Sequence, residues 1–235
     1  MSKHRPPYPI EYYQALRKEA NFGCAKCGVP IVTIHHIEGY EGEHHLRELI
    51  MLCKEHHSQA DQGLITKEEL YVLKTNPFNE ASVKHKLQVS PAKDIVVHIG
   101  GNTFVETPVP LQLHGEPIIS VRREGSEVLF SLTLYGKDGD TRVKMVDNVW
   151  EADASLVDVR YSEDTGNADV WLSIKLEDSE PYIEVRVIDG ELHLKGRFYL
   201  RGNLLDVRDD GSFVLNQQMY FRGITAIKCG VGIAI

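Results

Sequence analysis

The chain has 235 residues and carries 34 acidic side chains against 26 Lys and Arg, which gives a net charge of −8 at pH 7 with histidine neutral. This balance argues against a protein that holds nucleic acid through one broad basic face. No run of about 18 apolar residues occurs and no apolar stretch follows the basic start, so we expect neither a membrane span nor a secretory signal, and we place the protein in the cytoplasm.

Two segments of different character follow one another. Residues 1–80 hold seven of the eleven histidines and three of the four cysteines, and their charges, 9 basic against 11 acidic, sum to −2. Residues 81–235 carry 17 basic against 23 acidic side chains, a sum of −6, and have the pattern of successive strands. We therefore predict an α+β protein with two domains: a small metal-bound module over 1–80, then a mostly antiparallel all-β, sandwich-like domain over 81–235.

Two helices are predicted in the first segment. The stretch EYYQALRKEA, residues 11–20, combines good helix formers with apolar spacing for one buried stripe, and the prolines before it favour an extended lead-in. Thr66, with Glu69 three residues later, forms a capping-box pattern that predicts a second helix. That helix should end before Asn76-Pro77, because the residue before a proline avoids the helical conformation.

Three cysteines and a histidine form two pairs with the same internal spacing. Cys24-Ala-Lys-Cys27 and Cys53-Lys-Glu-His56 each place two donors three positions apart, with 25 residues between the pairs. Such pairs can supply the four corners of a tetrahedral ion. The spacing predicts a structural Cys3His zinc site, with packed or free thiols as the alternative. Cys229 stands far from these residues, and we expect it to be a small buried hydrophobe.

Four candidate groups are left over in the first segment: His35, His36, His57 and Asp61. They cannot join the same ion, because a structural zinc closes its shell at four ligands. If KEHHSQADQG forms a helix, His56 and His57 point about 100° apart, and His57 shares a face with Asp61. The stretch IVTIHHI predicts an exposed strand, on which His35 and His36 alternate sides and serve different roles. Buried histidines with backbone partners, and an Asp61 that is only a surface residue, are the alternative.

Over about residues 8–77 these features resemble the HNH (His-Asn-His) endonucleases and their ββα-metal fold. The resemblance rests on the initial helix, the knuckle CAKC, the paired histidines in IHHI, a loop, and LIMLCKEHH, which looks like the family's apolar run before a Cys-x-x-Cys-His. It implies that His35, His57 and Asp61 bind a catalytic ion and that His36 is the general base. The expectation is two ions that share one helix, with nucleic acid as the substrate and double-stranded DNA favoured by the resemblance.

Phosphodiester hydrolysis needs residues of these types. A neutral imidazole with a pKa of about 6.5 can take the proton of the attacking water at physiological pH. A divalent ion can neutralise the charge that develops on the phosphate. Asp61 stands where the family has a histidine, and its harder carboxylate favours Mg²⁺ or Mn²⁺ over a soft ion. The thiolates of the other site favour Zn²⁺.

The chain departs from the family at two positions. Glu48 stands where the central asparagine usually lies, and its carboxylate cannot donate through an amide to hold the loop that orients the general base. We keep Glu48 as a candidate for loop support. His44 and His45 lie close to this position in the sequence; we expect solvated loop histidines, with substitution for the asparagine as the alternative. His56 replaces the usual fourth cysteine, which is a mild change because imidazole is an ordinary zinc ligand.

Period-two alternation dominates the second segment, where turns such as Asp138-Gly139 and Asp189-Gly190 separate runs of β-branched and aromatic residues. We expect about eight to twelve strands. Trp150 and Trp171 are expected in the core rather than on a base-stacking platform. No clustered catalytic set is visible in the sequence, which favours target recognition, regulation, or oligomerisation with itself or a protein partner.

Together these features predict a metal-dependent HNH-type endonuclease that hydrolyses phosphodiester bonds. The first alternative is a zinc-stabilised binding module, for nucleic acid or protein, that has lost catalysis; Glu48 is the main reason for it. The second alternative is a structural or assembly protein in which the β domain does the main work.

Overall fold

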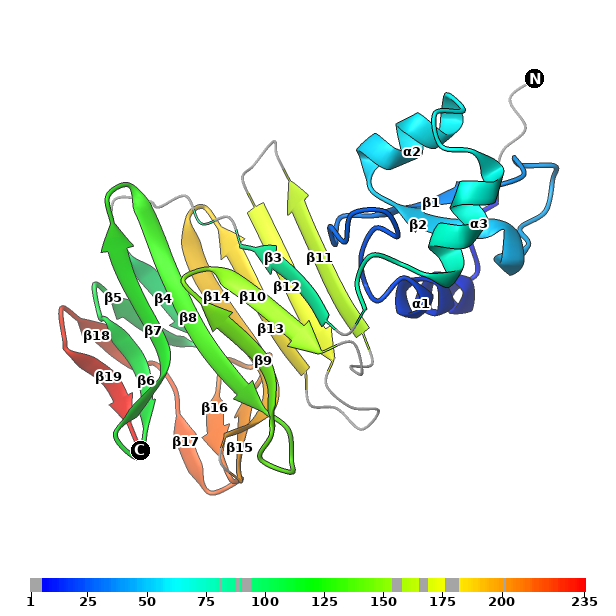
Figure 1. The fold of residues 1–235 in the computed structure, drawn as a ribbon. Helices are drawn as coiled ribbons and strands as arrows, with labels where there is room; N and C mark the ends of the chain where they lie inside the picture. The colour runs from blue at the N-terminus through cyan, green and yellow to red at the C-terminus, as the bar shows by residue number, and fades with distance from the viewer. Residues whose placement is uncertain are drawn as a thin grey trace. The chain divides into compact units, whose positions relative to one another are not determined.

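The computed structural model of the protein describes residues 6–80, 82–87, 89, 94–153, 158–164, 169–175, 182–200 and 202–235. The chain forms two compact units that divide between Lys84 and His85. Each is described by itself below, and both are drawn in Figure 1. None of the helices in the described ranges has the length and apolar character needed to cross a membrane.

The first unit combines three α-helices with a two-stranded antiparallel sheet. In chain order its elements are α1 (Ile10–Glu19), β1 (Thr33–His36), a short 3-10 turn (Leu46–Glu48), β2 (Leu49–Leu52), α2 (Lys54–Asp61) and α3 (Lys67–Thr75). The register of the sheet pairs Ile34 with Met51 and His35 with Ile50. The helix predicted over residues 11–20 is confirmed, shifted by one residue.

The start of α3 follows the predicted capping box. The Thr66 hydroxyl accepts from the backbone N–H of Glu69 at 3.2 Å, and the Glu69 carboxylate accepts from the backbone N–H of Thr66 at 2.8 Å. These two bonds satisfy amide donors that a helix N-terminus otherwise leaves without partners. The helix ends at Thr75, before Asn76-Pro77, as predicted.

Alternate residues of the small sheet pack into two separate apolar clusters. The cluster on the α3 side contains Cys24, Ala25, Ile37, Ile50, Leu52, Ile65 and Leu70. The cluster on the α1 side contains Leu16, Ala20, Ile34, Leu49 and Met51. Because both faces are covered, the expectation that the His35-His36 strand is exposed was wrong: His35 is 7% and His36 8% exposed.

The second unit is built almost entirely from strands. Its described strands are β4 (Val96–Ile99), β5 (Asn102–Val105), β6 (Val109–Leu113), β7 (Glu116–Glu124), β8 (Glu127–Tyr135), β9 (Thr141–Val146), β10 (Val149–Asp153), β11 (Asp158–Asp164), β12 (Asp169–Lys175), β13 (Tyr182–Ile188), β14 (Glu191–Leu200), β15 (Asn203–Val207), β16 (Phe213–Leu215), β17 (Met219–Phe221), β18 (Thr225–Ile227) and β19 (Val231–Ala234), while β3 (Ser82–Lys86) spans the division between units. The expectation of eight to twelve strands was too low, because single alternating stretches break into several strands at their turns.

Strand pairing in this unit is mostly antiparallel, as predicted. One antiparallel run joins β6 to β10 and another joins β11 to β17. Three parallel pairings connect distant parts of the chain: β14 with β4, β18 with β5, and β19 with β6. Figure 1 shows the first run in green and the second in yellow to orange. The parallel pairings bring residues about a hundred positions apart onto neighbouring strands.

Three residues of this unit, Trp150, Trp171 and Cys229, were predicted to be buried. Trp150 is fully buried, together with Phe130 and Phe198, and so belongs to the core as predicted. Trp171 is only half-buried, so the prediction that it belongs to the core was wrong; it lines a surface groove instead. Cys229 is exposed, which contradicts its predicted burial. The physical reason is its place in the turn between β18 and β19, where no strand face covers it.

Candidate functional site

The three cysteines and His56 of the predicted zinc site lie together. Cys24 and Cys27 come from the loop after α1, Cys53 is the residue before α2, and His56 lies in the first turn of that helix. Their ligand atoms all lie within 4.8 Å of one another. Among the described residues the structure therefore contains a Cys3His cluster that could bind a metal ion such as zinc.

The spacing of these donors suits a tetrahedral ion. The Sγ atoms of Cys27 and Cys53 are 3.9 Å apart, and Nδ1 of His56 lies 3.4 Å from Sγ of Cys24 and 3.3 Å from Sγ of Cys53. With Zn–S bonds of about 2.3 Å and Zn–N bonds of about 2.0 Å, two sulfurs in a tetrahedron lie about 3.8 Å apart, and a sulfur and a nitrogen about 3.5 Å. The four side chains thus already stand near the corners that zinc requires.

The local backbone explains why the knuckle turns at this point. Gly28 has φ +75°, and a Cβ there would lie 2.3 Å from Oδ1 of Asn79, so a larger residue would not fit. The N–H of Gly28 donates to the carbonyl of Cys24 at 2.8 Å, and the N–H of Ala25 donates to the carbonyl of Met51 at 2.9 Å. These bonds close the turn and fasten it to β2, beside the start of α2.

The thiols need a cation if they are to be charged together. Burial, with smaller contributions from the neighbouring Cys24 and Cys53, raises the pKa of Cys27 to about 12, against the lowering effect of a hydrogen bond with the backbone of Val29. A metal ion displaces such protons, because the thiolate is the ligand. The chemistry of this donor set therefore fits a structural metal.

Facing away from the cluster, α2 presents His57 and Asp61 to β1, as the 100° separation of His56 and His57 predicts. Nδ1 of His57 lies 3.1 Å from Oδ2 of Asp61, and Nδ1 of His35 lies 3.4 Å from Oδ1 of the same carboxylate. The three ligand atoms lie within 4.8 Å of one another. Side-chain exposure rises from 8% at His35 to 31% at His57 and 59% at Asp61, so the group is open to solvent on one side.

The distances leave room for either a proton or a metal ion between His57 and Asp61. Nε2 of His57 lies 3.3 Å from the carbonyl of Ile34, which can only accept, so Nε2 carries a proton. In the neutral ring Nδ1 is then an acceptor, yet it faces a carboxylate oxygen at 3.1 Å. Two acceptors at that distance repel unless a proton or a metal ion lies between them. Burial and the nearby His57 lower the pKa of His35, which keeps that ring in the neutral, metal-binding form.

His36 points to the other side of β1, as alternation predicts, and its partners were not predicted. Its Nε2 lies 3.0 Å from Nδ1 of His44, whose own Nε2 lies 3.0 Å from the carbonyl of Pro6. Because that carbonyl accepts, His44 donates from Nε2 and accepts at Nδ1, and His36 donates from Nε2. Nδ1 of His36 is left as the acceptor nitrogen, 3.5 Å from the hydroxyl of Tyr8.

The expectation for the loop histidines was wrong for one of the two. His44 is half-buried and bonded to His36, whereas His45 is exposed. The cause is the N-terminal lead-in, which lies against the loop: the rings of Tyr8 and His44 have centroids 4.3 Å apart. No local sequence signal could show a contact over 36 positions.

Glu48 supports the loop through its backbone. Its carbonyl accepts from the N–H of Ile37 at 2.8 Å, and its own N–H donates to the carbonyl of His45 at 2.8 Å. The carboxylate accepts from Nε of Arg47 at 3.0 Å. The loop therefore has backbone ties at residue 48 that do not depend on an amide side chain.

One hollow borders both of the paired histidines. It has a volume of about 360 Å³, and its lining includes His35, His36, Asp61, Thr66 and Lys67. Both adjacent histidines thus line this hollow, although their rings have different partners on opposite sides of β1. Lys67 is ion-paired with Glu38 at 2.7 Å, so its charge is largely neutralised there.

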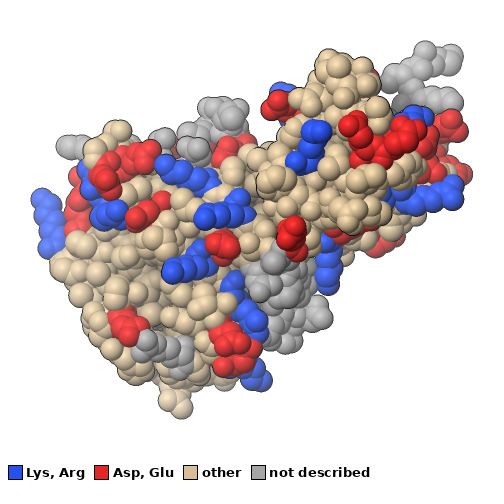
Figure 2. All heavy atoms as spheres, viewed as in Figure 1, with Lys and Arg blue, Asp and Glu red and all other residues tan. Residues whose placement is uncertain are grey.

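The surface around this hollow is acidic. A neighbouring hollow of about 680 Å³ is lined by Glu38, Glu41, Glu43 and Glu48, with Lys67 as its basic residue. On the face drawn in Figure 2, acidic side chains gather on the first unit and no broad basic patch is seen. A phosphate ligand would therefore be repelled from this surface unless a bound cation offset the charge.

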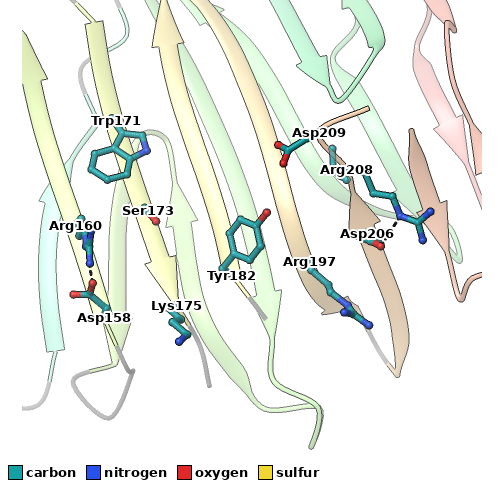
Figure 3. Close-up of a pocket in the computed structure, with 11 residues that line it drawn as sticks. Asp158, Arg160, Trp171, Ser173, Lys175, Tyr182, Arg197, Asp206, Arg208 and Asp209 are labelled. Atoms are coloured by element: carbon teal, nitrogen blue, oxygen red, sulfur yellow. Dashed lines mark hydrogen bonds and ion pairs between the residues drawn. The ribbon is translucent and has the colours of Figure 1, made fainter. Parts of the chain in front are cut away.

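A separate groove lies on the second unit. It has a volume of about 570 Å³, and Figure 3 shows Trp171, Tyr182 and several charged side chains from neighbouring strands around it. Its lining includes four cations (Arg160, Lys175, Arg197 and Arg208) and three carboxylates (Asp158, Asp206 and Asp209). Arg160 pairs with Asp158 at 2.7 Å and Arg208 with Asp206 at 2.8 Å. Such pairing leaves little net positive charge for nucleic acid, although Trp171 lies in the groove rather than in the core.

Comparison with known proteins adds no relative: no family model, no curated protein and no solved structure matches the chain.

Proposed function

We propose that the first unit is an HNH-type endonuclease module that hydrolyses phosphodiester bonds, with DNA as the substrate. The observation that carries the proposal is the grouping of His35, His57 and Asp61 on β1 and α2, with His36 bordering the same hollow. The order β1, β2, α2 agrees with the ββα-metal arrangement of the family that the sequence resembles. The Cys3His cluster, which we assign to zinc, would hold the start of α2 in place.

The donor set suggests which residues would hold the catalytic ion. Two imidazoles and a carboxylate suit a divalent metal, and the exposed side at Asp61 leaves room for water and phosphate. We propose Mg²⁺ or Mn²⁺, because Asp61 contributes a hard oxygen ligand. Such an ion would neutralise the charge that builds on the scissile phosphate.

His36 is the proposed general base. Its Nδ1 is the acceptor nitrogen of the neutral ring, because Nε2 donates to His44. That atom would take the proton of the attacking water, and His44 would hold the ring in the required tautomer. Through this bond, His44 takes over part of the positioning that the family's asparagine provides.

The test is nicking of supercoiled plasmid in the presence of Mg²⁺ or Mn²⁺. His36→Ala should lower the cleavage rate by about 10²–10⁴-fold, the usual contribution of a general base, and Asp61→Ala should abolish the cleavage that the added ion supports. His45→Ala is the matched control, because this exposed loop histidine should leave the rate unchanged. Circular dichroism must show that each variant is folded.

The acidic surface and Glu48 favour one alternative, a zinc-stabilised binding module without catalysis. In that case the purified protein would bind DNA or a protein partner and would cut nothing under any divalent ion. If it formed a large oligomer and ignored nucleic acid, an assembly role built on the β unit would replace the nuclease.

A further inference from the structure

A third group of residues that could hold a metal ion belongs to the second unit and shares no residue with the two groups of the first unit. His98 lies on β4, and Glu191 and His193 lie on β14. The parallel pairing of these strands places His193 directly opposite His98. Glu191 is two residues before His193, and side chains two apart on a strand point to the same face. The sheet register therefore puts all three groups on one face.

The three side chains contact one another closely. Nε2 of His98 lies 2.7 Å from Oε2 of Glu191, and the rings of His98 and His193 stack with centroids 4.4 Å apart and planes 17° apart. One ligand atom from each residue lies within 4.8 Å of the other two. Donors to a common tetrahedral ion lie about 3.3 Å apart for bonds of about 2.0 Å, so small side-chain rotations would bring the group to metal-binding distances.

A further residue orients the group. Oγ1 of Thr103 lies 3.2 Å from Nδ1 of His98, and the antiparallel register of β4 and β5 pairs these two residues. A hydroxyl at Nδ1 directs the other nitrogen of His98 toward Glu191. Metal-bound histidines usually have such a partner on the second ring nitrogen.

The surroundings leave a coordination position open. His98 and His193 line a hollow of about 400 Å³, together with Gly100, Gly101 and Gly211. A Cβ at Gly101 would lie 3.0 Å from the carbonyl of Gly211, so glycine permits the close approach of these loops beside the hollow. Two of the three candidate ligands, His98 and His193, thus border a water-accessible hollow, and a site with three protein ligands keeps its fourth position for water or a small ligand.

We propose that His98, Glu191 and His193 form a binding site for one divalent transition-metal ion of the zinc type. Without metal, the Nε2 proton of His98 lies between that ring and the Glu191 carboxylate. The ion takes the place of this proton, and His193 supplies the third ligand. The site is independent of the proposed nuclease, because all its residues belong to the second unit.

The test measures bound zinc after equilibrium dialysis of the full chain against Zn²⁺. His193→Ala should bind one ion fewer than the unaltered protein. Glu191→Gln keeps an oxygen that can accept from His98 and so should preserve the fold, but it should weaken this ion by at least about 10–100-fold. Thr103→Val should weaken it by about 10-fold. His114→Asn, at an exposed turn position with φ +49° that asparagine tolerates, is the control and should bind as the unaltered protein does.

A purely structural His–Glu hydrogen bond gives a different result. In that case Glu191→Gln and His193→Ala would bind the same number of zinc ions as the unaltered protein, with equal affinity, and the proposal would be overturned. Loss of zinc from the first unit cannot produce the expected pattern, because Cys3His ligation is untouched in all four variants.

Discussion

Removal of the metal from the Cys3His cluster should unfold the first unit and leave the second folded. The first unit ends at Lys84 and divides its apolar residues between two small clusters. A core of this size supplies about 3–5 kcal/mol, whereas a structural zinc contributes about 10–16 kcal/mol of binding free energy at pH 7. Most of the favourable free energy of the first unit would then come from the metal, and small domains of this kind couple their folding to metal binding, so we expect the metal-free first unit to be unfolded.

Circular dichroism can follow the first unit separately, because the α-helices and most of the strands belong to different units. All three α-helices among the described residues belong to the first unit, so the helical part of the circular dichroism spectrum reports on it alone. EDTA, or Cys53→Ser, should abolish that helical signal and the corresponding thermal transition while the strand signal persists. Cys229→Ser is the matched control, since this cysteine is exposed and outside the cluster. Retention of the helical signal and its transition after complete metal removal would refute the reasoning.

Three further predictions concern stability. Thr66→Ala removes the hydroxyl that caps α3 and should cost the first unit about 1 kcal/mol in urea unfolding. Gly196→Ala would place a Cβ 2.2 Å from the carbonyl oxygen of Tyr182, at φ +144°, and should cost the second unit about 2–3 kcal/mol; an unchanged urea midpoint would contradict this. Burial lowers the pKa of His85, against an opposing effect of Glu163, so protonation of this histidine favours the unfolded chain. The free energy of unfolding should therefore be highest above the unfolded-state pKa of about 6.5 and should fall toward pH 5. In His85→Gln the fall should be smaller.

Signals that depend on near neighbours in sequence were sufficient for part of the first unit. The capping box at Thr66 and the proline after Asn76 predicted both ends of α3. Helical and strand periodicity predicted that His57 would turn away from His56 and that His35 and His36 would face opposite sides. These are properties of bond geometry, which any local stretch carries in itself.

Features that depend on contacts between residues far apart in the sequence could not be predicted from local patterns. The burial of β1 depends on helices that come from both sides of it in the sequence. The bond from His44 to His36 requires the lead-in at Pro6 to lie against the loop. The group at His98 exists only because β4 and β14 pair in parallel with one particular register, and a shift of one residue would turn one set of side chains to the opposite face.

The short helix α2 links the two proposed metal sites physically. It has eight residues, none of them fully buried, and an isolated helix of that length is unstable in water. Apolar packing alone therefore does not fix the position of α2. His56 contacts Cys53 on one side of the helix, and His57 contacts the carbonyl of Ile34 on the other side; these contacts hold the helix in place. Cys53 precedes α2 and Asp61 is its last residue. The position of the Asp61 carboxylate therefore depends on whether a metal bound at Cys53 holds the start of the helix. If both proposed ions bind, the structural ion is thus a condition for the catalytic one, whereas the reverse dependence is weak because the Cys3His donors do not include Asp61.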